Sequence, residues 1–217
     1  MSAVHNAKIL WWRDELTINL MKKSLEEDYV SITATDTVLG FLARPSEKTH
    51  TIIDTIKGSK PDKPYLILIG SPQKLSAFVD VEKLSEEVKC ITKKCWPGPL
   101  TIIFNAKKNL PRFIQSKDGT VAIRCPRHTG LLNLLAHFEG VFSTSANKSG
   151  APVSKTSQEL SPELLMNIDY VVLDHQDVPA QLPSTIIDVT SSKIKLVRPG
   201  AYPIEKLEHV CGSRIVL

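Results

Sequence analysis

The sequence predicts an α/β fold in which helices flank a twisted, mixed sheet of parallel and antiparallel strands. Short apolar runs typical of buried strands alternate with longer amphipathic segments through most of the 217 residues, which favours a sheet covered by helices. Two runs near the end of the chain, 184–190 and 193–197, are spaced as a hairpin, so part of the sheet is antiparallel. No repeat, low-complexity stretch or linker is evident, and we therefore expect residues 1–217 to form a single domain.

Six more strands are expected where apolar runs end in polar or turn-forming residues. They cover 29–33, 65–69, the part of 96–106 that follows its opening turn, 120–126, 140–147 and 170–174. Apolar residues recur at helical spacing in 14–27, and Ser46 is an N-cap candidate for a second helix. Further helices are expected from Ser71-Pro72 and over 81–94, 128–138, 159–168 and 203–210.

Charge and composition are those of an ordinary globular protein. Lys and Arg number 27 and Asp and Glu 23, so the formal net charge is +4, which fits an anionic substrate but is too small an excess to argue nucleic-acid binding. The four cysteines form no C-x-x-C pair, so we expect reduced thiols and no metal site. No apolar run approaches the ~20 residues that span a bilayer, and no secretory signal is visible, so we expect a cytoplasmic protein.

Three polar clusters are candidates for a binding site, because open α/β sheets bind ligands where their strands end. Thr33–Thr37 holds three hydroxyls that can bind a zwitterion or a phosphate, although a threonine-rich strand edge explains them equally well. Lys57–Pro64 carries Lys57, Lys60 and Lys63 on a stiff loop that can neutralise a triphosphate or can simply be solvated. Ser143–Gly150 includes Ser145 and Asn147 and can form an anion nest, or a plain polar loop.

A cation on an expected strand is the other informative feature. Thr120 and Arg124 are four residues apart, so their side chains point to the same face of the strand. The neighbours of Arg124 are apolar, and a cation beside a core must find an anion or a cavity. A structural salt bridge is one reading and a bidentate clamp on a ligand carboxylate is the other.

In this order, these pieces resemble one family, the YrdC-like threonylcarbamoyl-adenylate synthases. TATDTVLGF at 33–41 is similar to the family's P-T-D-T-V-Y-G-L, and 57–64 is similar to its K-x-R-P-x-x-K-P. WPGPLT, TVAIRCP followed by His128, STSANKSG, PSTIIDV and RPG follow at the expected intervals. The resemblance covers roughly residues 10–205 and indicates the short, single-domain form. It implies a twisted sheet around a large concave, basic cavity.

The resemblance also implies a reaction and its residues. L-threonine, bicarbonate and ATP give threonylcarbamoyl-AMP and pyrophosphate, with Mg²⁺ held mainly through the nucleotide, and partner proteins then transfer the threonylcarbamoyl group to tRNA. The threonine contacts fall on Thr35, Arg124 and Ser184, and Lys57 and Arg124 are the expected catalytic residues. The nucleotide contacts fall on Lys57, Lys63, Thr120, Ser145, Asn147 and Arg198.

The sequence departs from the family pattern at three positions. Ser59 replaces the arginine of K-x-R, Leu39 replaces the tyrosine of V-Y-G-L, and Ala34 replaces the first proline. These departures leave open a non-catalytic module of the same fold that binds double-stranded RNA or tRNA. A different acyl-adenylate or carbamoyl-transfer enzyme on the same scaffold is a further alternative, because a fold does not fix a function.

Overall fold

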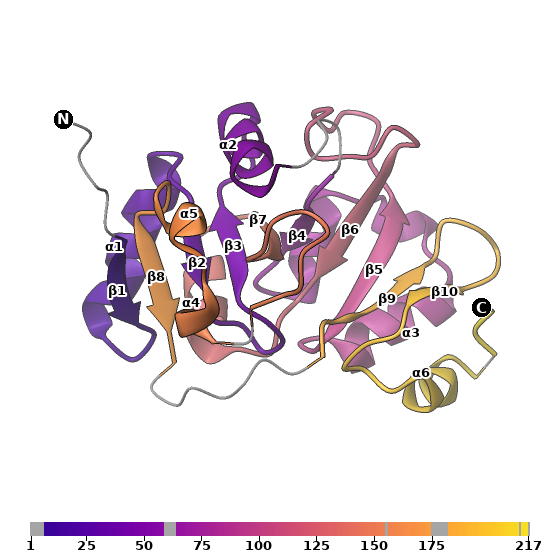
Figure 1. The fold of residues 1–217 in the computed structure, drawn as a ribbon. Coiled ribbons are helices and arrows are strands. Elements are labelled where there is room, and N and C mark those ends of the chain that lie inside the picture. The colour runs from indigo at the N-terminus through magenta and orange to yellow at the C-terminus, as the bar shows by residue number, and fades with distance from the viewer. Residues whose placement is uncertain (1–6, 59–63, 155, 175–181, 213, 217) are drawn as a thin grey trace.

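The strands of the described residues form one ten-stranded sheet, whose arrangement Figure 1 shows. The computed structural model describes residues 7–58, 64–154, 156–174, 182–212 and 214–216. Across the sheet the strands are ordered β1 (Lys8–Trp11), β8 (Tyr170–Leu173), β2 (Ser31–Thr33), β3 (Gly40–Ala43), β7 (Val141–Ser145), β4 (Leu66–Leu68), β6 (Thr120–Arg124), β5 (Leu100–Asn105), β9 (Thr185–Asp188) and β10 (Lys195–Arg198). Parallel and antiparallel neighbours both occur, β4 with β6 and β5 with β6 for example, which confirms the predicted mixed sheet.

All the predicted strands are present, and two more were missed. The missed strands are β1 and β3, of four residues each. The predicted helix over 14–27 follows β1, and the polar cluster Thr33–Thr37 precedes β3, and these stronger patterns hid the two short strands. The C-terminal hairpin forms as predicted, with β9 antiparallel to β10.

The helices agree with the predictions at 14–27, after Ser46, at 128–138 and at 203–210, but they are shorter than predicted within 81–94 and 159–168, and the stretch after Ser71-Pro72 differs. They are α1 (Glu15–Glu26), α2 (Glu47–Lys57), α3 (Glu86–Cys95), α4 (Thr129–Leu135), α5 (Pro162–Leu165) and α6 (Ile204–Cys211), with short 3₁₀ turns η1 (Pro72–Ala77), η2 (Val81–Lys83) and η3 (Ser157–Glu159). The stretch opened by Ser71-Pro72 is therefore 3₁₀ and not α-helical, as 3₁₀ turns are used in short connecting pieces.

Hydrophobic residues pack on both faces of the sheet. One cluster joins Ile123 and Phe142 of the sheet to α2, α3 and α6, through residues such as Ile53 and Leu207. The other joins Leu68 and Val141 to α1 and α4. Arg124 pairs with Leu68 across β6 and β4, so it points to this second face. Four side chains on that face of the sheet are only half-buried: Ile103, Thr120, Ala122 and Ile186. Part of this face therefore remains accessible to solvent.

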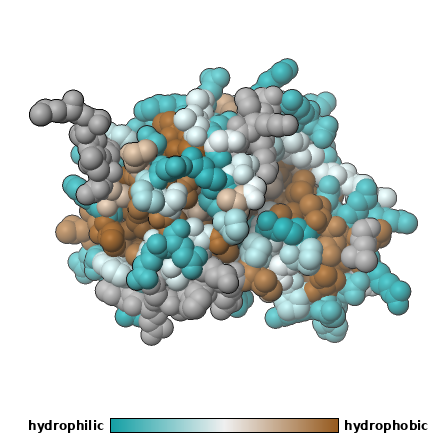
Figure 2. Space-filling view, in the orientation of Figure 1, coloured by the Kyte–Doolittle hydropathy of each residue, from teal (hydrophilic) through white to brown (hydrophobic). Residues whose placement is uncertain are grey.

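The surface shows apolar atoms near the two edges of the sheet (Figure 2). Ile9 on β1 and Val197 on β10 are more than half exposed, as edge strands often are. Within the described ranges, none of the helices combines the length and apolar character that crossing a membrane requires.

Helix α2 begins with a reciprocal cap that can be tested. Ser46 Oγ accepts a hydrogen bond from the Thr49 amide at 3.2 Å, and Thr49 Oγ1 accepts one from the Ser46 amide at 3.3 Å. We expect Ser46→Ala to lower the free energy of unfolding by about 1 kcal/mol in chemical denaturation. Ser161 also precedes a helix but makes no side-chain cap, so Ser161→Ala should change stability by less than about 0.5 kcal/mol. Equal losses in the two variants would contradict the assignment of this cap.

Candidate functional site

A buried arginine at the end of β6 is the centre of the candidate site. Only 4% of the Arg124 side chain is exposed, and its Nη2 is paired with the carboxylate of Asp36. Its Nη1 donates to Thr37 Oγ1 at 2.8 Å and its Nε donates to the Gly98 carbonyl at 3.2 Å. Burial lowers the pKa of Arg124, and the charge of Asp36 opposes that shift. Of the five N–H groups of a guanidinium, two thus have no acceptor in the part of the chain that the structure describes.

The loop between β2 and β3 brings Asp36 and Thr37 to this arginine. Its start is fixed because the Trp12 indole donates to the Ala34 carbonyl at 3.2 Å. The Thr35 hydroxyl donates to the Val38 carbonyl at 2.7 Å and lies 3.1 Å from Thr37 Oγ1. Thr35 therefore reaches Arg124 through Thr37, and its own hydroxyl is engaged within the loop.

Ser184 lies at the same end of the sheet, just before β9. Its Oγ is 2.8 Å from Thr101 Oγ1, and its carbonyl accepts from Arg198 Nη2 at 2.8 Å. Burial and the charge of Arg124 together lower the pKa of Arg198, so the two guanidinium groups are close enough to repel. This end of the site therefore carries an excess of positive charge and favours an anion.

A steric constraint explains why the Arg198-Pro199-Gly200 motif ends in glycine. A Cβ at Gly200 would lie 2.2 Å from the Pro183 carbonyl oxygen, which no side chain tolerates. Glycine thus lets the segment after β10 press against 183–185 and keeps Arg198 beside Ser184. Arg198 was predicted as a nucleotide contact, and the structure groups it with the predicted threonine contacts Arg124 and Ser184.

Lys57 and the loop after β7 form a second polar group. The Lys57 ammonium is buried and donates to the carbonyls of Ser145 and Asn147, both at 2.7 Å. The Lys57 carbonyl in turn accepts from the Ser149 amide at 2.8 Å, and Ser145 Oγ donates to Asn147 Oδ1 at 2.5 Å. Lys57, at the end of α2, therefore fixes the backbone of the predicted nucleotide loop at 145–149.

Thr120 lies on the face of Arg124 but at the opposite end of β6. Four residues of strand separate the two by about 13 Å. The registers of β4 with β6 and with β7 bring Thr120 level with Ser145, two strands away. Its hydroxyl is 2.8 Å from Ser116 Oγ. The predicted contacts thus form two groups. Arg124, Ser184 and Arg198 lie at one end of the second face, and Thr120 and Ser145 lie at the other, next to Asn147. Lys57 reaches the Ser145 and Asn147 carbonyls from α2, which packs on the opposite face, and Lys63 lies outside the described residues.

Sequence reasoning missed the residues that hold the predicted ones. Asp36, Thr37 and Thr101 had no assigned roles, although Asp36 is a lone carboxylate among hydroxyls and this was a usable signal. No signal identified the carbonyls that accept from Lys57, because backbone groups are invisible in side-chain patterns. Leu39, at the position of the family's tyrosine, is buried in the hydrophobic core.

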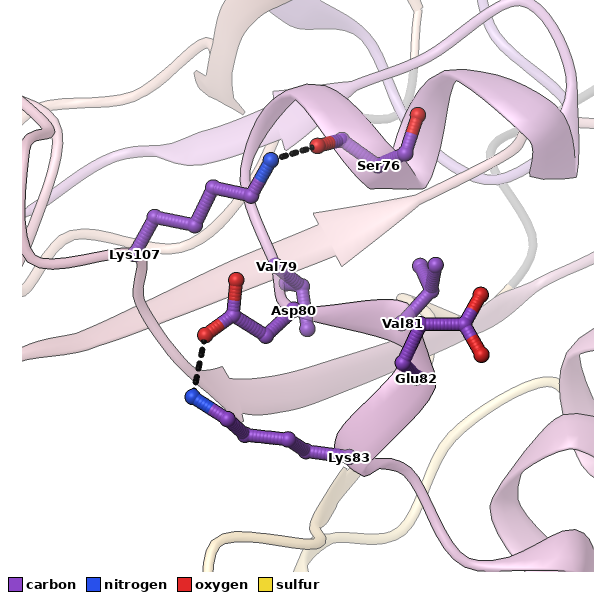
Figure 3. Close-up of a pocket in the computed structure, with 7 residues that line it drawn as sticks. All are labelled: Ser76, Val79, Asp80, Val81, Glu82, Lys83 and Lys107. Carbon is purple, nitrogen blue, oxygen red and sulfur yellow. Dashed lines mark hydrogen bonds and ion pairs between the residues drawn. The ribbon is translucent and has the colours of Figure 1, made fainter.

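A separate hollow of about 280 Å³ lies between η1, η2 and the end of β5 (Figure 3). It is lined by Ser76, Val79, Asp80, Val81, Glu82, Lys83 and Lys107. Lys83 is paired with Asp80 at 2.7 Å, and Lys107 donates to the Ser76 carbonyl. Its two cations are thus engaged and no predicted site residue lines it. The large basic cavity implied by the resemblance remains a prediction.

Comparison with known proteins decides the family. A family model, Sua5/YciO/YrdC with the description "Telomere recombination", matches residues 23–200. The chain belongs to this family. A threonylcarbamoyl-AMP synthase of Pyrococcus abyssi is 30% identical over 92% of this chain and 58% of its own length. Another of Klebsiella pneumoniae is 26% identical over 78% of this chain and 90% of its own.

Solved structures share the fold. P. abyssi Sua5 complexed with L-threonine superposes with a TM-score of 0.85 at 28% identity, over 97% of this chain and 62% of that one. Escherichia coli YciO superposes with a TM-score of 0.78 at 20% identity, over 93% of this chain and 99% of that one, and shows the fold alone. The chain therefore spans about three fifths of the P. abyssi protein, and nearly the whole of YciO. These neighbours confirm the predicted α/β architecture.

The hydrogen bonds of Lys57 predict a local loss of order when its charge is removed. Lys57→Met keeps the apolar stem but removes the ammonium that donates to the carbonyls of Ser145 and Asn147. We expect the free energy of unfolding to fall by about 1–3 kcal/mol, and amide exchange at 146–149 to accelerate. Lys148→Met is the control, because its ammonium makes an exposed ion pair with Glu163 and contributes little. Unchanged exchange in Lys57→Met would contradict this role.

Burial next to the Asp36–Arg124 pair makes one thiol unreactive. Burial raises the pKa of Cys125 to about 11, and Asp36 raises it further while Arg124 opposes the shift. Because only the thiolate is alkylated, we expect Cys125 in the folded chain at pH 8 to react at least about 100-fold more slowly with iodoacetamide than the unfolded chain does. Since the folded state holds this proton more tightly, the contribution to stability is present below the unfolded pKa and is lost as pH rises through about 11. Fast labelling, read by mass spectrometry of the peptide, would contradict the assigned environment.

Proposed function

We propose that this chain is an L-threonylcarbamoyladenylate synthase. The proposed reaction joins L-threonine, bicarbonate and ATP, and releases threonylcarbamoyl-AMP, pyrophosphate and water. The observation that carries the proposal is the buried Arg124 with its neighbour Arg198: Arg124 is paired with Asp36, whereas the guanidinium of Arg198 lies close enough to be repelled by Arg124 and contacts only Ser184 among the described residues. The names of the relatives and the threonine complex of a structural neighbour support the same substrate class.

The proposed threonine contacts are Arg124, Ser184 and Thr35. Arg124 has two N–H groups left for a carboxylate, and paired N–H donors are the geometry that carboxylates prefer. Ser184, fixed by Thr101, is available to a polar group of the substrate through its hydroxyl. Thr35 contributes by orienting Thr37 and, with a change of its own hydrogen bond, by direct contact.

The proposed nucleotide contacts occupy the rest of the face. Thr120 and Ser145 carry hydroxyl groups and Asn147 an amide, and Lys57 and Lys63 are the proposed contacts for the phosphates. Arg198, which lies beside Ser184, is the proposed nucleotide contact at the threonine end. Positive charge fixed in advance stabilises the charge that develops on the α-phosphate and on the departing pyrophosphate. Holding three substrates together removes much of the entropic barrier. Lys57 and Arg124 are the proposed catalytic residues, Lys57 acting partly by fixing the loop 145–149.

In the proposed reaction Mg²⁺ is held mainly through the bound ATP. In the described ranges no three His, Cys, Asp or Glu side chains gather as a metal site, and the carboxylate nearest Arg124, that of Asp36, is already paired. The residues present therefore do not form a protein-held magnesium site. Phosphate and water are the usual ligands of Mg²⁺ at such sites.

The wider assignment follows from the proposed reaction. The chain would be a nucleotidyltransferase formed by one domain over residues 1–217, in keeping with a single sheet and its two flanking hydrophobic clusters. Its product would pass to threonylcarbamoyl-transferase proteins that modify tRNA, and the cytoplasm is where these substrates meet. A non-catalytic RNA-binding module is the alternative, and it predicts binding that weakens steeply with salt.

Pyrophosphate release tests the proposal directly. We expect release from ATP with magnesium only when L-threonine and bicarbonate are both present. Arg124→Ala should reduce it at least about 100-fold, because a buried charge-assisted clamp is lost. Arg112→Ala removes an exposed arginine of the 106–119 loop and is the matched control. ATP binding without release in the unaltered chain would contradict the synthase, and salt-sensitive RNA binding would then favour the alternative.

A further inference from the structure

The ion pair between Arg124 and Asp36 is held rigidly from both sides. Arg124 is fixed by Thr37 Oγ1 and by the Gly98 carbonyl as well as by Asp36. The second oxygen of Asp36, Oδ2, accepts from the backbone amide of Arg127 at 2.9 Å. The pair therefore presents a positive and a negative group at a fixed separation, in a fixed order along the site.

The negative member of this pair remains accessible. The Asp36 side chain is 11% exposed, against 4% for Arg124. Each carboxylate oxygen has two lone pairs, and each oxygen of Asp36 makes one hydrogen bond among the described residues, so acceptor capacity is left. No other carboxylate in the described ranges is paired with Arg124 or with Arg198.

An amino acid has the complementary order of charges. Its carboxylate and ammonium sit on one carbon, a few ångströms apart, and an ammonium next to two guanidinium groups needs a nearby anion to offset the repulsion. With the substrate carboxylate on Arg124, a neighbouring ammonium can reach the accessible oxygens of Asp36. The four charges would then alternate in sign around a ring, so each favourable contact reinforces its neighbours.

From this geometry, and resting on the proposed function, we propose that Asp36 is the specificity residue that binds the α-ammonium group of the substrate. Arg124 alone would accept any small carboxylate. The Asp36–Arg124 pair instead selects a zwitterion, and Asp36 thereby distinguishes an α-amino acid from the same acid without its α-amino group.

The test compares two ligands that differ only in the amino group. L-Threonine and (R)-3-hydroxybutyrate share the carboxylate and the hydroxyl, so their affinities are measured by calorimetry with the full chain and with Asp36→Asn. The asparagine keeps the size and one acceptor oxygen but loses the charge. We expect the affinity for L-threonine to fall about 10- to 100-fold, the usual range for a charge-assisted hydrogen bond. The affinity for (R)-3-hydroxybutyrate should stay within about 3-fold or rise, because an anion near its carboxylate has been removed.

Equal losses for the two ligands would overturn the proposal, since they would mean that Asp36 only orients Arg124. Unchanged affinity for both ligands would overturn it as well. Asp80→Asn, which removes an exposed carboxylate of the distant hollow, is the matched control and should change neither affinity.

A second variant keeps the test decisive if Asp36→Asn does not fold. Asp36→Glu retains the charge beside Arg124 and moves it by one methylene group, so it should fold and lower the preference for L-threonine without abolishing it. A preference identical to that of the unaltered chain would contradict the proposal. Failure of the unaltered chain to bind L-threonine at all would instead refute the proposed function. Binding without pyrophosphate release would leave the ammonium contact standing and count against the synthase reaction alone.

Discussion

Burial of the Arg124 guanidinium is the constraint on which the rest of the site depends. A cation this deep is tolerated only with an anion and further acceptors, since an unpaired buried charge costs several kcal/mol. Asp36 and Thr37, both from the loop after β2, and the Gly98 carbonyl, from the turn before β5, supply them. The loop after β2, the turn before β5 and the end of β6 are therefore held in one arrangement. The bond from the Gly98 amide to the Cys125 carbonyl at 2.8 Å supports the same arrangement.

The buried charge of Lys57 is stabilised in a different way. Its ammonium is buried against the carbonyls of Ser145 and Asn147, at 2.7 Å each, so its charge is offset by dipoles of the main chain. These contacts hold the backbone of the loop after β7, in which the Asn147 side-chain amide also donates to the carbonyls of Lys148 and Ala151. The two buried cations thus have different proposed roles. Arg124 has two N–H groups left for a ligand carboxylate, whereas Lys57 fixes the backbone of the loop after β7.

The sequence allowed the sheet, most helices and the composition of the site to be predicted, because these depend on local pattern. Alternating apolar runs identified eight of the ten strands, and Ser46 identified the start of α2. Spacing also predicted that Thr120 and Arg124 share a face. It could not predict that Arg198 lies with Ser184 and that Thr35 reaches Arg124 through Thr37, because both depend on contacts between segments far apart in the chain. Carbonyl partners such as Gly98 leave no trace in side-chain patterns at all.

The arrangement also fits the proposed binding of a zwitterion and a nucleotide at a site with few carboxylates. Burial and, to a smaller extent, the charge of Arg124 lower the pKa of Arg198, so this end of the site favours an anion. Had more acids been present, they would have neutralised both guanidinium groups and repelled the phosphates of a nucleotide. A single carboxylate, fixed on one arginine, offsets part of the charge and leaves the remainder for ligands. The position of Asp36 therefore matters as well as its charge: in the proposed complex it places the negative group beside the ammonium and away from the end where phosphates would bind.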